Sequence, residues 1–279
     1  MRTTTVSLRE TLRTSAYVET LSETVAVARR AQISLLAASL AYFGFLSLFP
    51  FALLVIIVLT TLGGEYFGDV AADMLADVLG EQISRQFDDE GFITNAGLPS
   101  TLGSLAVLLW GSMRLYWSSD QAFAAIYGEH DDATLVSTLR NASLVFLTNL
   151  AAIVLLGGIG IWFGLSGRTA ALVAPLLLFF VLIAVFLPVF YIFPHVDVTV
   201  REILPGTVLA AGVWAVASSG FRVYAGSAST VAYGVAGAIV LLLSWLYIVG
   251  LATLVGAALN AVLGGHVDPD DEWVPTDYM

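Results

Sequence analysis

The sequence contains no cysteine and no lysine, and only 12% of its 279 residues are charged. The absence of cysteine excludes disulfides, thiolate metal sites and cysteine nucleophiles. The charged fraction lies well below the roughly 25% that is usual for soluble domains, while 58% of the residues are hydrophobic. These proportions predict an integral membrane protein.

The eleven basic residues are all arginines. The sequence has twenty-two acidic residues, so its formal net charge is −11. Sequence-independent binding of nucleic acid needs clustered lysine and arginine, so we predict no nucleic-acid partner. So acidic a surface is typical of halophilic proteins. Acidity alone is also common in mesophilic proteins, and both interpretations stay open.

Six uncharged runs are long enough to cross a bilayer core of about 30 Å, which takes roughly 20 helical residues. They cover residues 38–62, 101–119, 142–165, 170–193, 203–220 and 235–263. We therefore predict an all-α, polytopic membrane protein with six transmembrane helices, some of them bent at proline. The first uncharged run, residues 31–64, is too long for one upright crossing, so it must tilt, bend or begin along the interface.

The arginines predict the orientation, since five precede the first span and Arg140 and Arg201 fall in the second and fourth loops. The positive-inside rule places those segments in the cytoplasm. We predict a multi-pass protein of the cell (plasma) membrane with cytoplasmic N- and C-termini. Its parts are a helical cytoplasmic segment at residues 1–30 without a cleavable secretory signal, a membrane domain at 31–264 and an acidic cytoplasmic tail at 265–279.

The one sizeable outer loop, residues 65–99, has acidic side chains at every fourth position. They are Asp69, Asp73, Asp77 and Glu81. This spacing predicts an amphipathic extracytoplasmic helix with one acidic stripe. The stripe is either a rim that collects cations over a pore or a solvated face lying against the membrane or the bundle, and the second interpretation is favoured.

The sequence lacks the usual signatures of a catalytic site. His130, His195 and His266 lie in three separate segments, and none has a second histidine at metal-ligand spacing. Neither GxxxxGK[ST] nor GxSxG occurs, and no span has an acidic residue in its interior. We predict that the protein is not an enzyme and has no catalytic residue, metal ligand or cofactor. Each histidine is interpreted as an ordinary loop residue.

Polar residues inside the spans are few, and Arg114 is the most informative of them. It lies about one turn inside the cytoplasmic end of its span, where a charge is costly unless it is paired or snorkels. Snorkelling or a structural contact with a carbonyl group is favoured over a role in substrate binding. Arg222, near the outer end of the fifth span, has the same alternatives.

The last span has small or polar residues at every fourth position, namely Ala252, Gly256 and Asn260. Small residues at this spacing allow neighbouring membrane helices to approach closely. We therefore predict a packed helix interface in which Asn260 forms a hydrogen bond to a neighbouring helix.

Residues 39–51, SLAYFGFLSLFPF, resemble the first-span pattern L-A-Y-Y-x-x-x-S-L-F-P of the YihY/BrkB family. Three later stretches resemble the family in the same order: LLWGSMRLYWSSDQAFAAIYG, YIFPHVDVTVREILPGTVLAAGVW and the block at residues 221–263. The resemblance covers residues 25–265 or so. Two positions depart from the pattern, since Ala258 replaces the usual acid of Gly-Ala-Glu-Leu-Asn-Ala and Ala124 replaces a common asparagine.

The resemblance implies six helices with both ends in the cytoplasm, but it implies no single activity. Members have been labelled tRNA-processing ribonucleases, virulence or serum-resistance factors, and exporters of lipidic or small substrates. A ribonuclease is not expected here, because metal ligands are missing and the surface is acidic. A mechanism that requires the family acid is not expected here, because Ala258 stands in its place.

Two functions remain in competition. The first is a transporter or exporter of a lipidic or small-molecule substrate without its own ATPase, which is favoured because Pro50 and Pro188 should interrupt their spans. The alternative is a non-transporting membrane scaffold that organises the envelope. The expected partners are membrane lipids, and either a second copy of the chain or another envelope protein.

The candidate substrate-path or family-motif residues are Ser39, Tyr42, Ser47, Pro50, Arg114, Tyr127, Pro205, Gly206, Arg222, Tyr233, Gly234, Trp245, Tyr247, Gly256 and Asn260.

Overall fold

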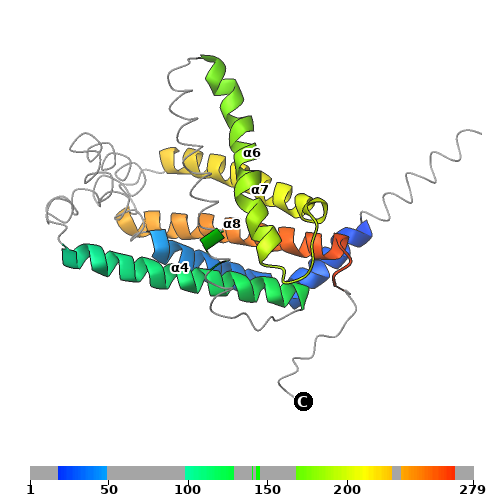
Figure 1. Ribbon diagram of the computed structural model, residues 1–279. Coiled ribbons are helices and arrows are strands. Elements are labelled where there is room, and N and C mark those ends of the chain that lie inside the picture. Colours follow the sequence, from blue (N-terminus) through cyan, green and yellow to red (C-terminus); the bar gives the residue numbers. More distant parts are fainter. Residues whose placement is uncertain are drawn as a thin grey trace, which may run out of the picture. The chain divides into compact units, whose positions relative to one another are not determined.

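The computed structural model describes residues 18–48, 98–128, 140, 143–144, 168–227 and 234–267. All regular structure within these ranges is α-helical, and Figure 1 draws it as coiled ribbons without a strand arrow. The all-α prediction is therefore confirmed for the part of the chain that the structure describes.

Four long helices carry labels in Figure 1, and their bounds extend beyond the corresponding predicted spans at one or both ends. They are α4 (Leu98–Tyr127), α6 (Arg168–Ile192), α7 (Val200–Ser227) and α8 (Gly234–Leu263). Two shorter helices, Val18–Arg30 and Ile33–Leu48, precede them and are blue in the figure. Nearly all of the predicted span at 142–165 and of the outer helix at 65–99 lies outside the described residues, as does Pro50.

Two stretches of the described helices are long and apolar enough to cross a membrane, Val200–Ser218 and Ile239–Leu263. The N-terminal pair of helices adds a third if its two bent halves form a single span, and Phe179–Ile192 is a shorter apolar helix. Membrane-spanning helices are thus present, whereas the predicted number of six is not established by the described ranges.

The N-terminal helices meet at an angle of 63°. Gln32 adopts a left-handed backbone conformation with φ of 50°, and its N–H bonds to the carbonyl of Arg29 at 3.1 Å instead of one residue further back. The carbonyl of Gln32 then accepts from Leu35 and Leu36, which starts the second helix. The bend falls at the beginning of the uncharged run 31–64. The length of this run predicts a tilt, a bend or a start along the interface, and a bend is observed.

Proline interrupts the helices less than the sequence suggests. Helix α6 continues through Pro188 to Ile192, so the predicted break at this proline is not observed. Proline removes one hydrogen bond, from position 188 to the carbonyl of Ala184, and the bonds of the other residues carry the helix past it. Helix α7 likewise runs through Pro205.

The chain forms two compact units, each assembled from separate segments. The first contains residues 1–37, 119–217 and 249–279, and the second contains residues 38–118 and 218–248. In the first unit, Phe123 packs edge-on against Phe190 at 6.0 Å and beside Phe193 at 5.4 Å, and both Phe123 and Phe190 are buried. This aromatic core fixes the end of α4 against the end of α6.

Candidate functional site

Helices α7 and α8 approach closely at Gly206 and Gly256 in the first unit. A Cβ atom added to Gly256 would lie 2.6 Å from the carbonyl oxygen of Gly206, which no real side chain could do without a shift. Asn260, 1% exposed, accepts a hydrogen bond from the Gly206 N–H at 2.7 Å and donates one to the Ile203 carbonyl at 3.0 Å. The predicted interhelical hydrogen bond of Asn260 is confirmed, and we call these four residues the α7–α8 contact.

The α7–α8 contact lies where α7 contains Pro205. Proline has no N–H, and its ring crowds the preceding turn of the helix. The side chain of Asn260 supplies an acceptor and a donor to that same turn. Ile203 also accepts from the hydroxyl of Thr207 at 2.7 Å, so its carbonyl is shared by two side chains. Asn260 thus acts in packing, and its place on a substrate path stays a prediction.

Two pairs of a histidine and a carboxylate lie in the first unit, among residues of α4, α7 and the segments that follow α6 and α8, and the ring of Tyr127 lies beside one of the pairs. We call these five residues the helix-end cluster: Asp120, Tyr127, His195, Glu202 and His266. The Nε2 atom of His195 lies 3.2 Å from an Asp120 carboxylate oxygen, and that of His266 lies 3.5 Å from Glu202. The ring of Tyr127 lies 6.1 Å from that of His266. Segments far apart in the sequence therefore converge here.

His266 is held in place by the end of α8. The N–H of His266 bonds to the Ala261 carbonyl at 3.0 Å, and the N–H of Gly265 bonds to Val262 at 3.1 Å. This pair of bonds is a Schellman motif, which needs a left-handed residue after the helix. Gly265, with φ of 67°, supplies it. The chain therefore turns sharply and directs His266 back toward α7.

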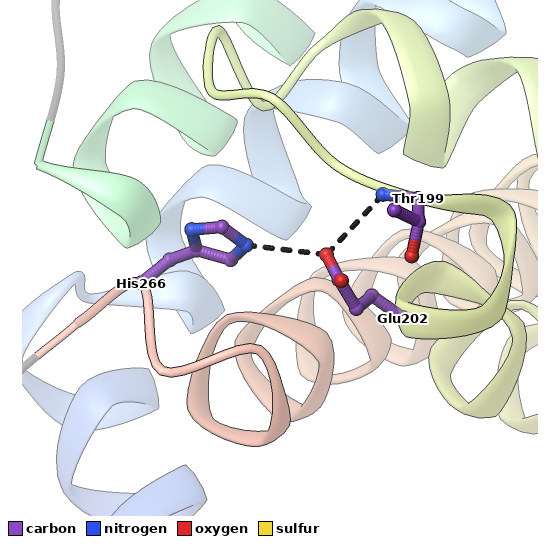
Figure 2. Close-up of polar contacts among 3 residues, drawn as sticks. All are labelled: Thr199, Glu202 and His266. Atoms are coloured by element: carbon purple, nitrogen blue, oxygen red, sulfur yellow. Dashed lines mark hydrogen bonds and ion pairs between the residues drawn. The ribbon is translucent and has the colours of Figure 1, made fainter.

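Glu202 is held in place by the start of α7. Thr199 and Glu202 have the Thr-x-x-Glu spacing of a capping box, and the N–H of Thr199 donates to the Glu202 carboxylate at 3.2 Å. Figure 2 shows the bonds from Thr199 and His266 meeting at one carboxylate oxygen of Glu202. A negative charge at this position is also stabilised by the positive end of the helix dipole.

Tyr127 and His195 each have a buried polar atom without a hydrogen-bond partner. Within the described part of the chain, the hydroxyl of Tyr127 and the Nδ1 atom of His195 are buried and have no hydrogen-bond partner. Burial raises the pKa of the Tyr127 phenol above its ordinary value, and the charge of Glu202 raises it further. Tyr127 therefore stays protonated at physiological pH and presents a buried donor.

The interpretation of the histidines as loop residues and not metal ligands stays a prediction, but it did not include the carboxylates that lie beside His195 and His266. Two local signals could have placed His266 and Glu202: the glycine pair Gly264–Gly265 and the capping box. No comparable signal links His195 to Asp120. His130 lies outside the described residues, and among those described no group of three or more potential ligands could hold a metal ion.

The pair formed by Glu202 and His266 can be tested by a double-mutant cycle. We expect Glu202→Gln and His266→Ala each to lower the thermal stability of the purified protein. The double variant should lose little more than the worse single variant, because both changes break the same contact. Asp197→Asn, which alters an exposed acid of the same turn, is the control and should have no effect. Fully additive losses would contradict the pairing.

In the second unit, the side chain of Arg114 lies between two tryptophans of its own helix. Its guanidinium carbon is 5.7 Å from the ring centroid of Trp110 and 5.7 Å from that of Trp117. Trp110 and Trp117 stand four residues before and three after Arg114, so all three side chains share one face of α4. The favoured expectation of a carbonyl contact or snorkelling did not include these aromatic contacts.

Other sequence-predicted residues of the second unit serve in helix packing. The hydroxyls of Ser39 and Ser118 are hydrogen-bonded to each other. Ser47 donates to the carbonyl of Phe43 at 2.9 Å, and its oxygen would lie 2.8 Å from a Cβ atom added to Gly111. Tyr42 is exposed. The helices are therefore in close contact at both serines.

The remaining predicted residues are distributed along α7 and α8 without forming one site. Arg222 lies in α7, Gly234 begins α8, and Trp245 and Tyr247 are half-buried in α8. Tyr233 lies outside the described residues. A role for these residues in a substrate path stays a prediction.

Helices of this length and apolarity, with few charges between them, define a helical membrane protein. Residues 24–275 match the family described as Virulence factor BrkB, and the chain belongs to this family. The resemblance stated from the sequence is confirmed.

Relatives share about three residues in ten with this chain. The ribonuclease-like protein YfkH of Bacillus subtilis (strain 168) is 28% identical over 85% of this chain and 92% of its own length. UPF0761 membrane proteins are 27% identical in Xanthomonas oryzae pv. oryzae (strain PXO99A) and 31% identical in Laribacter hongkongensis (strain HLHK9). This chain spans 60% and 57% of the length of those two relatives. No solved structure matches the chain at comparable significance.

Proposed function

We propose that the protein is a transporter or exporter of a lipidic or small-molecule substrate, and that the helix-end cluster is a polar gate at one end of its path. The observation that carries the proposal is the burial of the Tyr127 hydroxyl without a hydrogen-bond partner beside Glu202 and His266. A buried hydroxyl without a hydrogen-bond partner costs about 1 to 3 kcal/mol, and a role in function would explain why it is retained. A scaffold that only organises other envelope proteins has no need of such a buried group.

The side chains of the helix-end cluster can form hydrogen bonds with a substrate. The Tyr127 hydroxyl and the unpaired Nδ1 of His195 can each form a hydrogen bond with a polar group that enters from the helix ends. The His266–Glu202 contact of 3.5 Å is longer than a strong ion pair, so a polar group that enters can replace it.

The proposal includes the topology and surroundings of the protein. Six spans follow from the six uncharged runs, and the arginine distribution places both termini in the cytoplasm. On this topology the ends of α4 and α8 and the start of α7 lie on the cytoplasmic side. Lipids are the proposed direct partners, together with either a second copy or another envelope protein. The protein is proposed to have no enzymatic activity, cofactor or nucleic-acid partner, although one relative has a ribonuclease-like name.

The test is transport by the purified protein in liposomes, with pH or sodium gradients imposed and with both labelled phospholipids and small solutes as substrates. Tyr127→Phe should keep the yield and thermal stability of the wild type, because the hydroxyl has no hydrogen bond to lose. Its rate of transport should fall severalfold. Tyr191→Phe, a change at an exposed tyrosine of α6, is the matched control and should transport normally.

Two results would count against the proposal in different ways. Normal transport by Tyr127→Phe would remove the helix-end cluster from the mechanism. Absence of any transport by the wild type under every gradient would favour the second candidate, a non-transporting scaffold. That candidate has an observation of its own, since the α7–α8 contact joins two helices backbone to backbone and suits a rigid support.

A further inference from the structure

Arg114 carries its charge on an exposed, apolar face of α4. Its side chain is exposed, and so is Val107 at 48%, which lies seven residues earlier on the same face of the helix. On the topology predicted from the sequence, α4 contains the second span, and exposed apolar side chains of a membrane span face lipid or a partner protein. Within the described residues, no ion pair is recorded for Arg114, and its two contacts are with tryptophan rings. The guanidinium therefore keeps unused hydrogen-bond donors.

The tryptophans limit where those donors can point. Each ring lies 5.7 Å from the guanidinium carbon, one turn before and one turn after Arg114 along the helix. Trp110 is 48% exposed, Trp117 is 41% exposed and Arg114 is itself exposed, so the two rings leave the group accessible. Tryptophan side chains favour the depth of lipid headgroups. The planar guanidinium is thus presented outward at headgroup level, with apolar surface around it.

We propose that Trp110, Arg114 and Trp117 bind the phosphodiester headgroup of an anionic phospholipid. A guanidinium donates two parallel hydrogen bonds to a phosphate, and it tolerates aromatic neighbours on its faces at the same time. The apolar face around Arg114 accepts the acyl chains of the same molecule. Charge complementarity selects an anionic lipid, because the choline group of phosphatidylcholine already neutralises its own phosphate. This site does not depend on the proposed transport function.

The experiment is native mass spectrometry of the purified full chain titrated with phosphatidylglycerol or phosphatidylcholine. The wild type should retain phosphatidylglycerol in preference to phosphatidylcholine. Arg114→Gln should lower the fraction of protein with bound phosphatidylglycerol about fivefold, the effect expected for one cation at an anionic membrane surface. Arg114→Lys should bind at an intermediate level, since it keeps the charge and loses the planar fork. Trp110→Leu should weaken binding as well.

Arg201→Gln is the matched control, because it removes another exposed arginine, which lies in α7 away from the tryptophans of α4. Equal losses in Arg201→Gln and Arg114→Gln would overturn the proposal, since net charge alone would then explain lipid retention. Unchanged binding in Arg114→Gln would also overturn it. Displacement of the lipid by inorganic phosphate at equal concentration would identify an anion site instead. If Arg114→Gln fails to fold, binding of Arg114→Lys at the wild-type level overturns the proposal.

Discussion

Replacing Gly206 with alanine should destabilise the protein by about 3 kcal/mol or more, the upper range for forcing extra volume into a packed core. The new Cβ atom would fall on the carbonyl oxygen of Gly256 and lie 2.6 Å from the Asn260 amide nitrogen. The carbonyl is backbone and cannot rotate away, so α7 and α8 must separate. Thermal unfolding followed by size-exclusion chromatography should then show a large drop in the fraction that remains monodisperse.

Two further variants make this expectation specific. Gly103→Ala is the control, because nothing lies within 4 Å of a Cβ atom at Gly103, which is also helical. Alanine there should be neutral or stabilise α4 by about 0.5 to 1 kcal/mol. Gly256→Ala should be as harmful as Gly206→Ala, and the double variant should lose less than the sum, because both open the same gap. Wild-type stability of Gly206→Ala would refute the close contact.

Replacing Asn260 with leucine should cost about 2 kcal/mol of stability. The change keeps most of the volume but leaves the buried Gly206 N–H without its partner at 2.7 Å and removes the bond to the Ile203 carbonyl at 3.0 Å. A buried unpaired donor costs about 1 to 3 kcal/mol. Hydrogen bonds between membrane helices average about 0.6 kcal/mol, so the unpaired backbone group dominates the loss.

Thr253→Val is the matched control for the Asn260 variant. Thr253 is also buried in α8, but its hydroxyl bonds to the Val249 carbonyl of its own helix at 2.9 Å. Valine there should change the unfolding temperature little, since no bond between helices is lost. Equal losses for the two variants would mean that burial of a polar group, and not the bond to α7, sets the effect.

The sequence predicted the α7–α8 contact because its signal is local. Small residues at every fourth position of one helix must share a face, and a polar residue on that face needs a partner on the neighbouring helix. The partner itself, the backbone of Ile203 and Gly206, could not be named, since it depends on how far α7 slides along α8. The described helices likewise appear where long apolar runs predict them.

The helix-end cluster was missed because its pairs join distant segments. His266 and Glu202 are 64 residues apart in the sequence, and nothing in the composition of either segment refers to the other. His195 reaches Asp120 only because its backbone adopts a left-handed φ of 57°, a conformation that is uncommon for residues other than glycine. Lone histidines therefore carry little information until the helix ends are placed in space.

The α7–α8 contact has a consequence for tolerance to mutation. Asn260 bonds to main-chain atoms of α7, and every amino acid at position 203 has the same backbone carbonyl. Side chains on α7 can therefore change while their recognition by α8 persists, provided that position 206 stays glycine. A shift of α7 by a single residue would instead lose both hydrogen bonds at once. Hydrogen bonds to backbone atoms fix the position of α7 along α8. Substitutions at neighbouring positions therefore leave the alignment of the two helices unchanged.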